Sequence, residues 1–152
     1  AKLVLISPDG YASPGIKYGK KTEIPAIAQL YRYFFSKTFL AMNLEPAYAN
    51  PKTLNDDLVN RYYDLMLAPG VRGAILARMQ QTVLKDPVPS LANIQVPTLL
   101  IWGEKDAFIP ISNSNDYLKV MPNVKRVSLP NIGHLPQEEQ PTIGLAALKE
   151  FL

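Results

Sequence analysis

The sequence predicts an α/β fold in which three parallel strands are flanked by helices and carry an inserted helical cap. Two strand-like runs, the apolar residues 98–102 and the mixed residues 124–129, are each stopped by glycine or proline and are separated by a segment of helix length. A further apolar run, residues 3–6, lacks polar alternation, which is typical of a strand covered on both faces. Helical periodicity with proline breaks fills the stretch between the first strand and the other two.

The elements follow in order from local signals. The first strand ends in the turn sequence Ser-Pro-Asp-Gly. An unusually aromatic amphipathic pattern then predicts one long helix, with Pro25 near its start. Thr53 or Asn55 can cap the next helix. The expected helices of this middle region cover residues 27–42, 56–67 and 71–85.

The pattern of the C-terminal part predicts a strand, a helix, a second strand and a second helix. Ser112 or Asn113 can cap the helix between the two strands, Pro122 breaks it, and Pro141 opens the last helix. A crossover of this length is right-handed and makes its two strands parallel. We therefore expect one unit with a core at residues 1–15 and 88–152 and a helical cap at residues 16–87.

Composition excludes several kinds of function. The 16 basic and 13 acidic residues give a net charge of +3 and are scattered, which predicts no nucleic-acid partner. No apolar run approaches the ~18 residues of a membrane span, so no membrane association is expected. Zero cysteines and one histidine predict no disulfide and no metal centre. We expect no cofactor and a small molecule as the substrate.

The candidate site lies at the carboxyl edge of the predicted sheet. Asp106 follows the strand at residues 98–102, and His134 follows the strand at 124–129, so both emerge at the edge where open α/β sheets bind ligands. A carboxylate beside an imidazole holds one ring nitrogen and leaves the other free as a general base. Phe108, Ile109 and Leu135 flank the pair and are expected to line a substrate pocket.

Two other carboxylates are rivals for the acid. Glu104 stands two residues before Asp106, and Asp9 follows the first strand. Asp9 also fits the preferred chemistry of a β-turn.

The segments WGEKDAFIP and NIGHLPQEEQP resemble the acid and base segments of the α/β-hydrolase fold family, in particular its cap-bearing branch. That branch includes carboxylesterases, haloalkane dehalogenases, epoxide hydrolases and carbon–carbon bond hydrolases. The family's triad runs in the order nucleophile, acid, histidine, with the nucleophile on a G-x-S-x-G elbow. The resemblance implies that Asp106 is the acid and His134 the base.

The elbow itself is missing. No G-x-S-x-G, G-x-D-x-G or G-x-C-x-G occurs in these 152 residues. We therefore expect the C-terminal part of a truncated α/β-hydrolase fold, which self-associates or pairs with a missing N-terminal portion. The implied activity of the complete protein is hydrolysis of a small apolar ester. The alternatives are haloalkane, epoxide or C–C bond hydrolysis, or a non-catalytic fragment or interaction module.

Overall fold

The computed structural model describes residues 1–12, 17–20 and 24–152, which form two compact units. The first unit comprises Ala1–Tyr11, Glu45–Thr53 and Pro87–Leu152, and the second comprises Ala12–Leu44 and Leu54–Asp86. The expected core and cap had bounds close to these units. The main difference is Glu45–Thr53, which was expected in the cap and belongs to the unit that holds the sheet.

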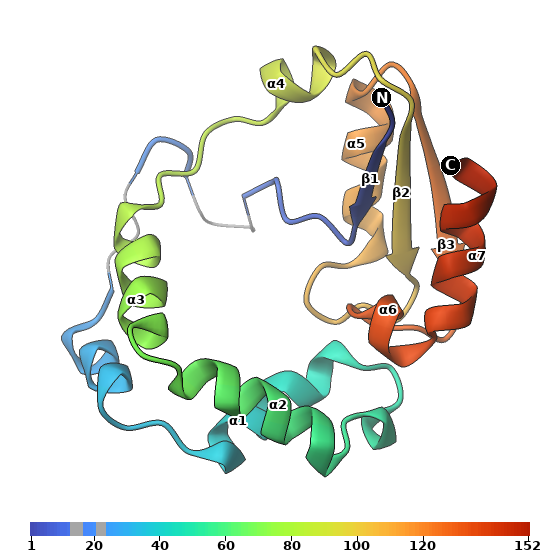
Figure 1. Cartoon of the computed structure of the whole chain (residues 1–152). Coiled ribbons are helices and arrows are strands. Elements are labelled where there is room, and N and C mark those ends of the chain that lie inside the picture. The colour runs from blue at the N-terminus through green and yellow to red at the C-terminus, as the bar shows by residue number, and fades with distance from the viewer. Residues whose placement is uncertain (13–16, 21–23) are drawn as a thin grey trace. The chain divides into compact units, whose positions relative to one another are not determined.

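The first unit is built on a parallel sheet whose strands lie in the order β1-β2-β3 (Figure 1). The strands are β1 at Leu3–Ile6, β2 at Thr98–Gly103 and β3 at Val124–Leu129. Leu3 pairs with Thr98, and Thr98 in turn pairs with Val124. The truncated α/β fold with parallel strands that the sequence predicts is confirmed.

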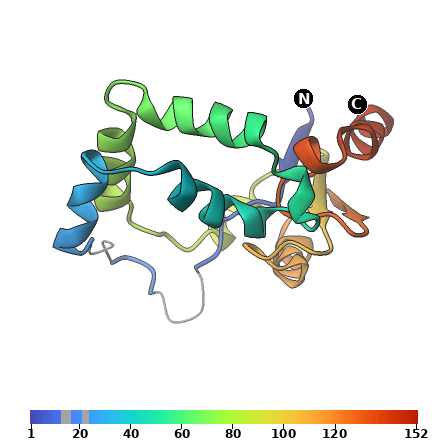
Figure 2. The same cartoon turned by 90° about the horizontal axis from the view of Figure 1, so that it is seen from below.

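Helices cover both faces of β2, as the view along the strands shows (Figure 2). Leu99 and Ile101 pack toward the last helix, whereas Leu100 and Trp102 pack toward Tyr117 of the crossover helix. All six residues of β2 are buried, which explains why its sequence has no polar alternation. The covering helices are α5 at Ser114–Val120 and α7 at Pro141–Phe151.

Shorter elements complete this unit. They are η2 at Glu45–Ala47, η3 at Pro51–Thr53, α4 at Val88–Ala92, η4 at Ile111–Asn113 and α6 at Pro136–Glu139. Strand β1 is only partly covered, with Ile6 44% exposed. Its expected burial on both faces is therefore not reached in this chain.

The second unit is helical, with η1 at Ala26–Arg32, α1 at Lys37–Leu44, α2 at Asp56–Leu67 and α3 at Val71–Gln81. The prediction of a continuous helix at residues 27–42 was wrong, because Ser36 starts a new one. Its hydroxyl accepts a hydrogen bond from the Phe39 N–H at 3.1 Å, and its carbonyl accepts one from the Leu40 N–H. Within the described ranges, every helix is too short or too polar to cross a lipid bilayer.

The helix predicted at residues 71–85 ends early. Thr82 leaves the helical conformation with a ψ of 120°, and its hydroxyl donates to the Arg78 carbonyl at 2.7 Å. Serine and threonine hydroxyls compete in this way with the regular backbone pattern. The helix α3 therefore stops at Gln81.

Candidate active site

Asp106 lies in the turn after β2, and its carboxylate is fully enclosed. The Phe108 and Ile109 N–H groups donate to Oδ1 at 3.0 and 2.8 Å. The side chain is 0% exposed. Aspartate favours turns of this kind because its carboxylate can bond the backbone a few residues ahead. The turn thus directs Oδ2 away from its own backbone.

His134 lies in the loop after β3, and its Nδ1 is 2.9 Å from Asp106 Oδ2. Two backbone bonds join the two loops, from Glu104 N–H to the Leu129 carbonyl and from Lys105 N–H to the Ile132 carbonyl. The imidazole side chain is 24% exposed. The expected meeting of the two side chains at the ends of neighbouring parallel strands is therefore present in the structure.

The electrostatics of Asp106 determine which imidazole nitrogen carries the proton. Burial raises the pKa of this carboxyl, but hydrogen bonds from His134 and the Ile109 N–H, the nearby Ser7 hydroxyl and the charge of His134 outweigh burial and hold the pKa below its ordinary value. At neutral pH the group is an acceptor-only carboxylate. Nδ1 therefore carries the proton in the neutral imidazole, and Nε2 has the free lone pair.

Ser7 also supports the aspartate, and its part was not predicted from the sequence. It follows β1, is buried, and has a φ of +41°. Its hydroxyl makes no well-formed hydrogen bond among the described residues, yet it lies close enough to Asp106 to help lower the pKa of that carboxyl. Backbone strain of this kind often persists at functional sites.

The three expected pocket residues differ in their surroundings. Phe108 is 46% exposed, and its ring centre lies 5.3 Å from that of His134. Ile109 packs instead on the cluster around Trp102, and its carbonyl accepts the Trp102 indole N–H at 2.8 Å. Leu135 is half-buried, and its carbonyl accepts N–H groups of α6. Of the three residues, Phe108 is thus the one whose ring contacts the imidazole.

The rival carboxylates lie on the surface. Glu104 and Asp9 are both exposed, and the carboxylate recorded within hydrogen-bond distance of His134 is that of Asp106. In the ranges that the structure describes, histidine and acidic side chains form no group of three or more that could hold a metal ion.

The histidine loop is also held by the Glu45–Thr53 segment of the same unit. The His134 N–H donates to the Ala47 carbonyl at 2.7 Å. Gly133 lies so close to the backbone of Ala47 and Ala49 that a β-carbon there would overlap both. The glycine before the histidine is therefore required for space.

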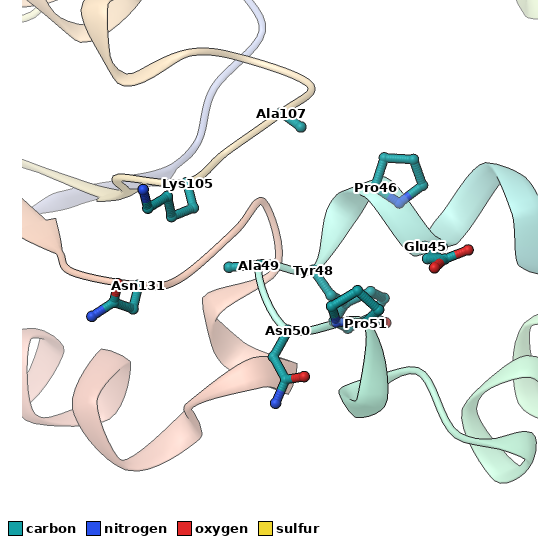
Figure 3. Close-up of a pocket in the computed structure, with 9 residues that line it drawn as sticks. All are labelled: Glu45, Pro46, Tyr48, Ala49, Asn50, Pro51, Lys105, Ala107 and Asn131. Atoms are coloured by element: carbon teal, nitrogen blue, oxygen red, sulfur yellow. The ribbon is translucent and has the colours of Figure 1, made fainter.

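A cavity of about 560 Å³ lies beside these loops (Figure 3). Lys105 and Ala107, the neighbours of Asp106, line it together with Asn131 and residues of the Glu45–Thr53 segment. Asp106 and His134 themselves are not among its lining residues. The cavity therefore borders the acid and histidine loops without opening onto the pair.

Comparison with known proteins identifies the family. Residues 11–141 match the alpha/beta hydrolase fold family, which covers most of the chain. The protein belongs to this family, as the resemblance of its acid and histidine segments predicted.

Individual relatives agree with this assignment. The uncharacterized hydrolase YugF of Bacillus subtilis (strain 168) is 24% identical over 155 aligned positions, which cover 100% of this chain and 56% of YugF. The solved structure of CarC, a serine hydrolase involved in carbazole degradation, has a TM-score of 0.76 and 21% identity, covering 99% of this chain and 53% of CarC.

The meta-cleavage product hydrolase CumD from Pseudomonas fluorescens IP01 has a TM-score of 0.74 and 18% identity, and the match covers 99% of this chain and 54% of CumD. At such identities the structural likeness establishes the fold alone. The chain spans about half the length of the relatives it matches.

Proposed function

We propose that this chain carries the acid and the base of a nucleophile–His–Asp triad in a hydrolase that acts on a small apolar ester. The observation that supports this most directly is the 2.9 Å approach of His134 Nδ1 to the buried Asp106 carboxylate at the carboxyl edge of the sheet. In this arrangement the carboxylate orients the ring and stabilises the imidazolium that forms during the reaction.

In the proposed reaction His134 Nε2 takes the proton of the nucleophile as it attacks the ester carbonyl. The resulting imidazolium then returns the proton to the leaving alcohol, and a water molecule repeats both transfers to release the acid. Asp106 stays ionised throughout, which fits the depressed pKa of its carboxyl.

In this proposal the nucleophile and the oxyanion donors come from the rest of the complete protein, because these 152 residues contain no nucleophile elbow. CarC is described as a serine hydrolase, and we extend a serine nucleophile to the complete protein on that basis. An aspartate nucleophile is the alternative, and there His134 would activate water to release the covalent intermediate.

The apolar character of the proposed substrate rests on the surface beside the imidazole. Phe108 leaves nearly half of its surface exposed beside the imidazole. Pockets for small apolar ligands are lined mainly by such side chains.

Carbon–carbon bond hydrolysis is the second candidate. The structural likeness to CumD, a meta-cleavage product hydrolase, favours it over the haloalkane and epoxide alternatives. The same acid and base would serve that reaction. The two candidates are therefore distinguished by which substrate the protein turns over.

The proposed partner is a strand. We propose that the half-covered β1 pairs either with its counterpart in a second copy or with an N-terminal portion of the complete protein, because an exposed strand edge is a template for pairing. No nucleic acid, membrane, metal or cofactor enters the proposed reaction.

The test is an assay of the full-length protein with short p-nitrophenyl esters and with a meta-cleavage product. We expect ester turnover that falls by roughly 10⁴-fold or more in His134→Ala and by about 10³- to 10⁴-fold in Asp106→Asn. Glu104→Gln, the matched control, should retain activity within about twofold, since a change at the surface away from the pair removes no transition-state contact.

The outcomes separate the hypotheses. Turnover of the meta-cleavage product but not of esters would support the second candidate. Activity that survives His134→Ala would refute the triad, and a full-length protein inactive on both substrates would favour the non-catalytic reading. The 152-residue chain alone should not exceed background, because it lacks the nucleophile and the oxyanion donors.

A further inference from the structure

Glu139, the last residue of α6, is a buried carboxylate with three backbone donors. Its Oε2 accepts the Gly133 N–H at 2.7 Å and the Ala49 N–H at 3.2 Å, and its Oε1 accepts the Asn50 N–H at 2.8 Å. The residue is only 9% exposed. Burying a carboxylate is costly unless such bonds compensate for the lost hydration. The three backbone bonds therefore compensate for the burial of Glu139 between the loops.

We propose that Glu139 is the positioning residue of the catalytic histidine. It ties the Gly133–His134 turn to the Glu45–Thr53 segment and thereby holds the imidazole on Asp106. This inference rests on the proposed function of the same site. Glu139 does not touch the imidazole itself and acts through the backbone that carries it.

The path from Glu139 to the imidazole is short. Gly133 donates to the carboxylate, and the next N–H, that of His134, donates to the Ala47 carbonyl. The Gly133 N–H is therefore bonded to Glu139 itself, and the His134 N–H is bonded to the Glu45–Thr53 segment, in which Glu139 also accepts the Ala49 and Asn50 N–H groups. A displacement of this turn by an ångström would break the 2.9 Å contact between Nδ1 and Asp106.

A carboxylate is the group that this cluster requires. It offers acceptors on both oxygens and has no donor that could oppose an N–H. In Glu139→Gln the amide NH₂ must face at least one of the three backbone donors, so one bond is lost and two donors confront each other. The substitution is nearly isosteric and therefore tests the hydrogen bonds more than the volume.

Glu138 supplies the matched control. It is the preceding residue on α6, and its Oε2 accepts the Tyr48 hydroxyl at 2.6 Å. Glu138→Gln removes the same charge and keeps an acceptor for that hydroxyl. The control therefore separates a change in local charge from the loss of the backbone bonds.

The experiment is NMR on the 152-residue chain with labelled histidine, since His134 is the only histidine. We expect a downfield Nδ1–H signal in the unmodified chain, as a charge-assisted hydrogen bond to a carboxylate produces. In Glu139→Gln this signal should shift upfield or be lost, and the amides of Gly133, Ala49 and Asn50 should exchange at least about tenfold faster, equivalent to 1.4 kcal/mol or more of lost local protection. Glu138→Gln should leave the signal unchanged.

Glu139→Asp is the second variant, for the case that Glu139→Gln does not fold. It keeps the charge but shortens the side chain by one methylene, so that fewer of the three donors are reached, and we expect the same changes at smaller amplitude. A folded Glu139→Gln or Glu139→Asp chain with an unchanged Nδ1–H signal would overturn the proposal, because a merely structural residue would leave the His134–Asp106 bond intact.

Kinetics of the full-length protein provide an independent check. Glu139→Gln should lower kcat about tenfold or more while KM changes little, since the ring is displaced and the substrate contacts remain. If His134→Ala proves active, the proposed function fails. The NMR result still decides whether Glu139 positions the ring, so the two failures are distinguishable.

Discussion

Asp106 couples the candidate site to folding, because its carboxyl has a lowered pKa in the folded chain. Because this pKa is lower in the folded chain, Asp106 stabilises the protein at pH values above its unfolded pKa of 3.8. This stability is lost as the pH falls through the folded pKa. Asp106→Asn removes the titration. We expect the variant to lose about 2 kcal/mol of unfolding free energy at neutral pH and progressively less below that unfolded value.

Denaturant unfolding of both proteins between about pH 7 and pH 2 measures this difference, a range that brackets ordinary aspartate pKa values. Asp116→Asn controls for the loss of one exposed negative charge, since Asp116 lies on the surface near Lys119. A destabilisation by Asp106→Asn that does not change with pH would contradict the prediction.

Two substitutions of Ser7 distinguish the effect of its backbone strain from the effect of its hydroxyl. Its φ of +41° suits glycine better than any other residue. Ser7→Ala keeps the strain and loses the hydroxyl, whereas Ser7→Gly relieves the strain and loses the same hydroxyl. We expect the pKa of Asp106 to rise in both variants, and Ser7→Gly to be more stable than Ser7→Ala by roughly 1 kcal/mol.

Carboxyl ¹³C NMR titration and thermal unfolding measure these two effects separately. An Asp106 titration that is unchanged in both variants would show that the hydroxyl has no part in the acidity of this carboxyl.

The contact between Asp106 and His134 could be predicted from the sequence, but the groups around it could not. Asp106 and His134 could be placed because each follows a predicted strand, and parallel strands bring such positions to one edge. Ser7 lies in a strained conformation after β1, and Glu139 accepts N–H groups from two loops. Contacts of that kind leave no periodicity in the sequence. The packing of Ile109 on the cluster around Trp102 likewise leaves no signal in the sequence.

At the scale of elements, Asn55 begins α2. Its Oδ1 accepts the Leu58 N–H at 2.9 Å, with Asp56 and Asp57 in the first turn. Such a cap satisfies an otherwise unpaired donor. We expect Asn55→Ala to cost about 1 kcal/mol of stability in the helical unit, and Asn55→Asp only a few tenths.

Hydrogen exchange at Leu58 and Val59, the first amides whose bonds depend on this residue, measures the effect locally. Equal exchange in the two variants would show that the side-chain oxygen does not cap the helix.

Helix boundaries were harder to predict than strands. The strand at residues 124–129 was predicted with its observed bounds, because Pro130 and the preceding turn leave little freedom. The aromatic pattern of residues 27–42 suits one helix equally well as two. The Ser36 cap divides it, and a lone serine inside an amphipathic pattern is too common to predict a break.

At the scale of the whole molecule, β1 is the element whose sequence and surroundings disagree. Its residues are all apolar, yet among the described residues it pairs only with β2. The Leu3 N–H and the Ser7 N–H donate to carbonyls of the β2 side, those of Pro97 and Ile101. Because backbone groups alternate along a strand, the amides of Val4 and Ile6 point toward the open edge.

An apolar cavity of about 240 Å³ lies next to this edge, lined by Val4, Ile6, Ile101, Leu145 and Leu148 among others. Open backbone donors beside exposed apolar surface favour pairing with another strand. We therefore expect the 152-residue chain on its own to self-associate through β1 at micromolar concentration. Ile6→Lys should shift it toward monomer, since a charged side chain on an edge strand opposes pairing.

Sedimentation velocity over a concentration series measures the association, and hydrogen exchange locates it. Leu65→Lys is the control, because Leu65 is an equally apolar and 59% exposed residue on α2 of the other unit. It should leave the association unchanged while adding the same charge. A folded monomer whose Val4 and Ile6 amides exchange freely at micromolar concentration would count against pairing through β1. Association that Leu65→Lys weakens as much as Ile6→Lys would instead indicate a general effect of charge, because only the lysine at position 6 lies on the open edge.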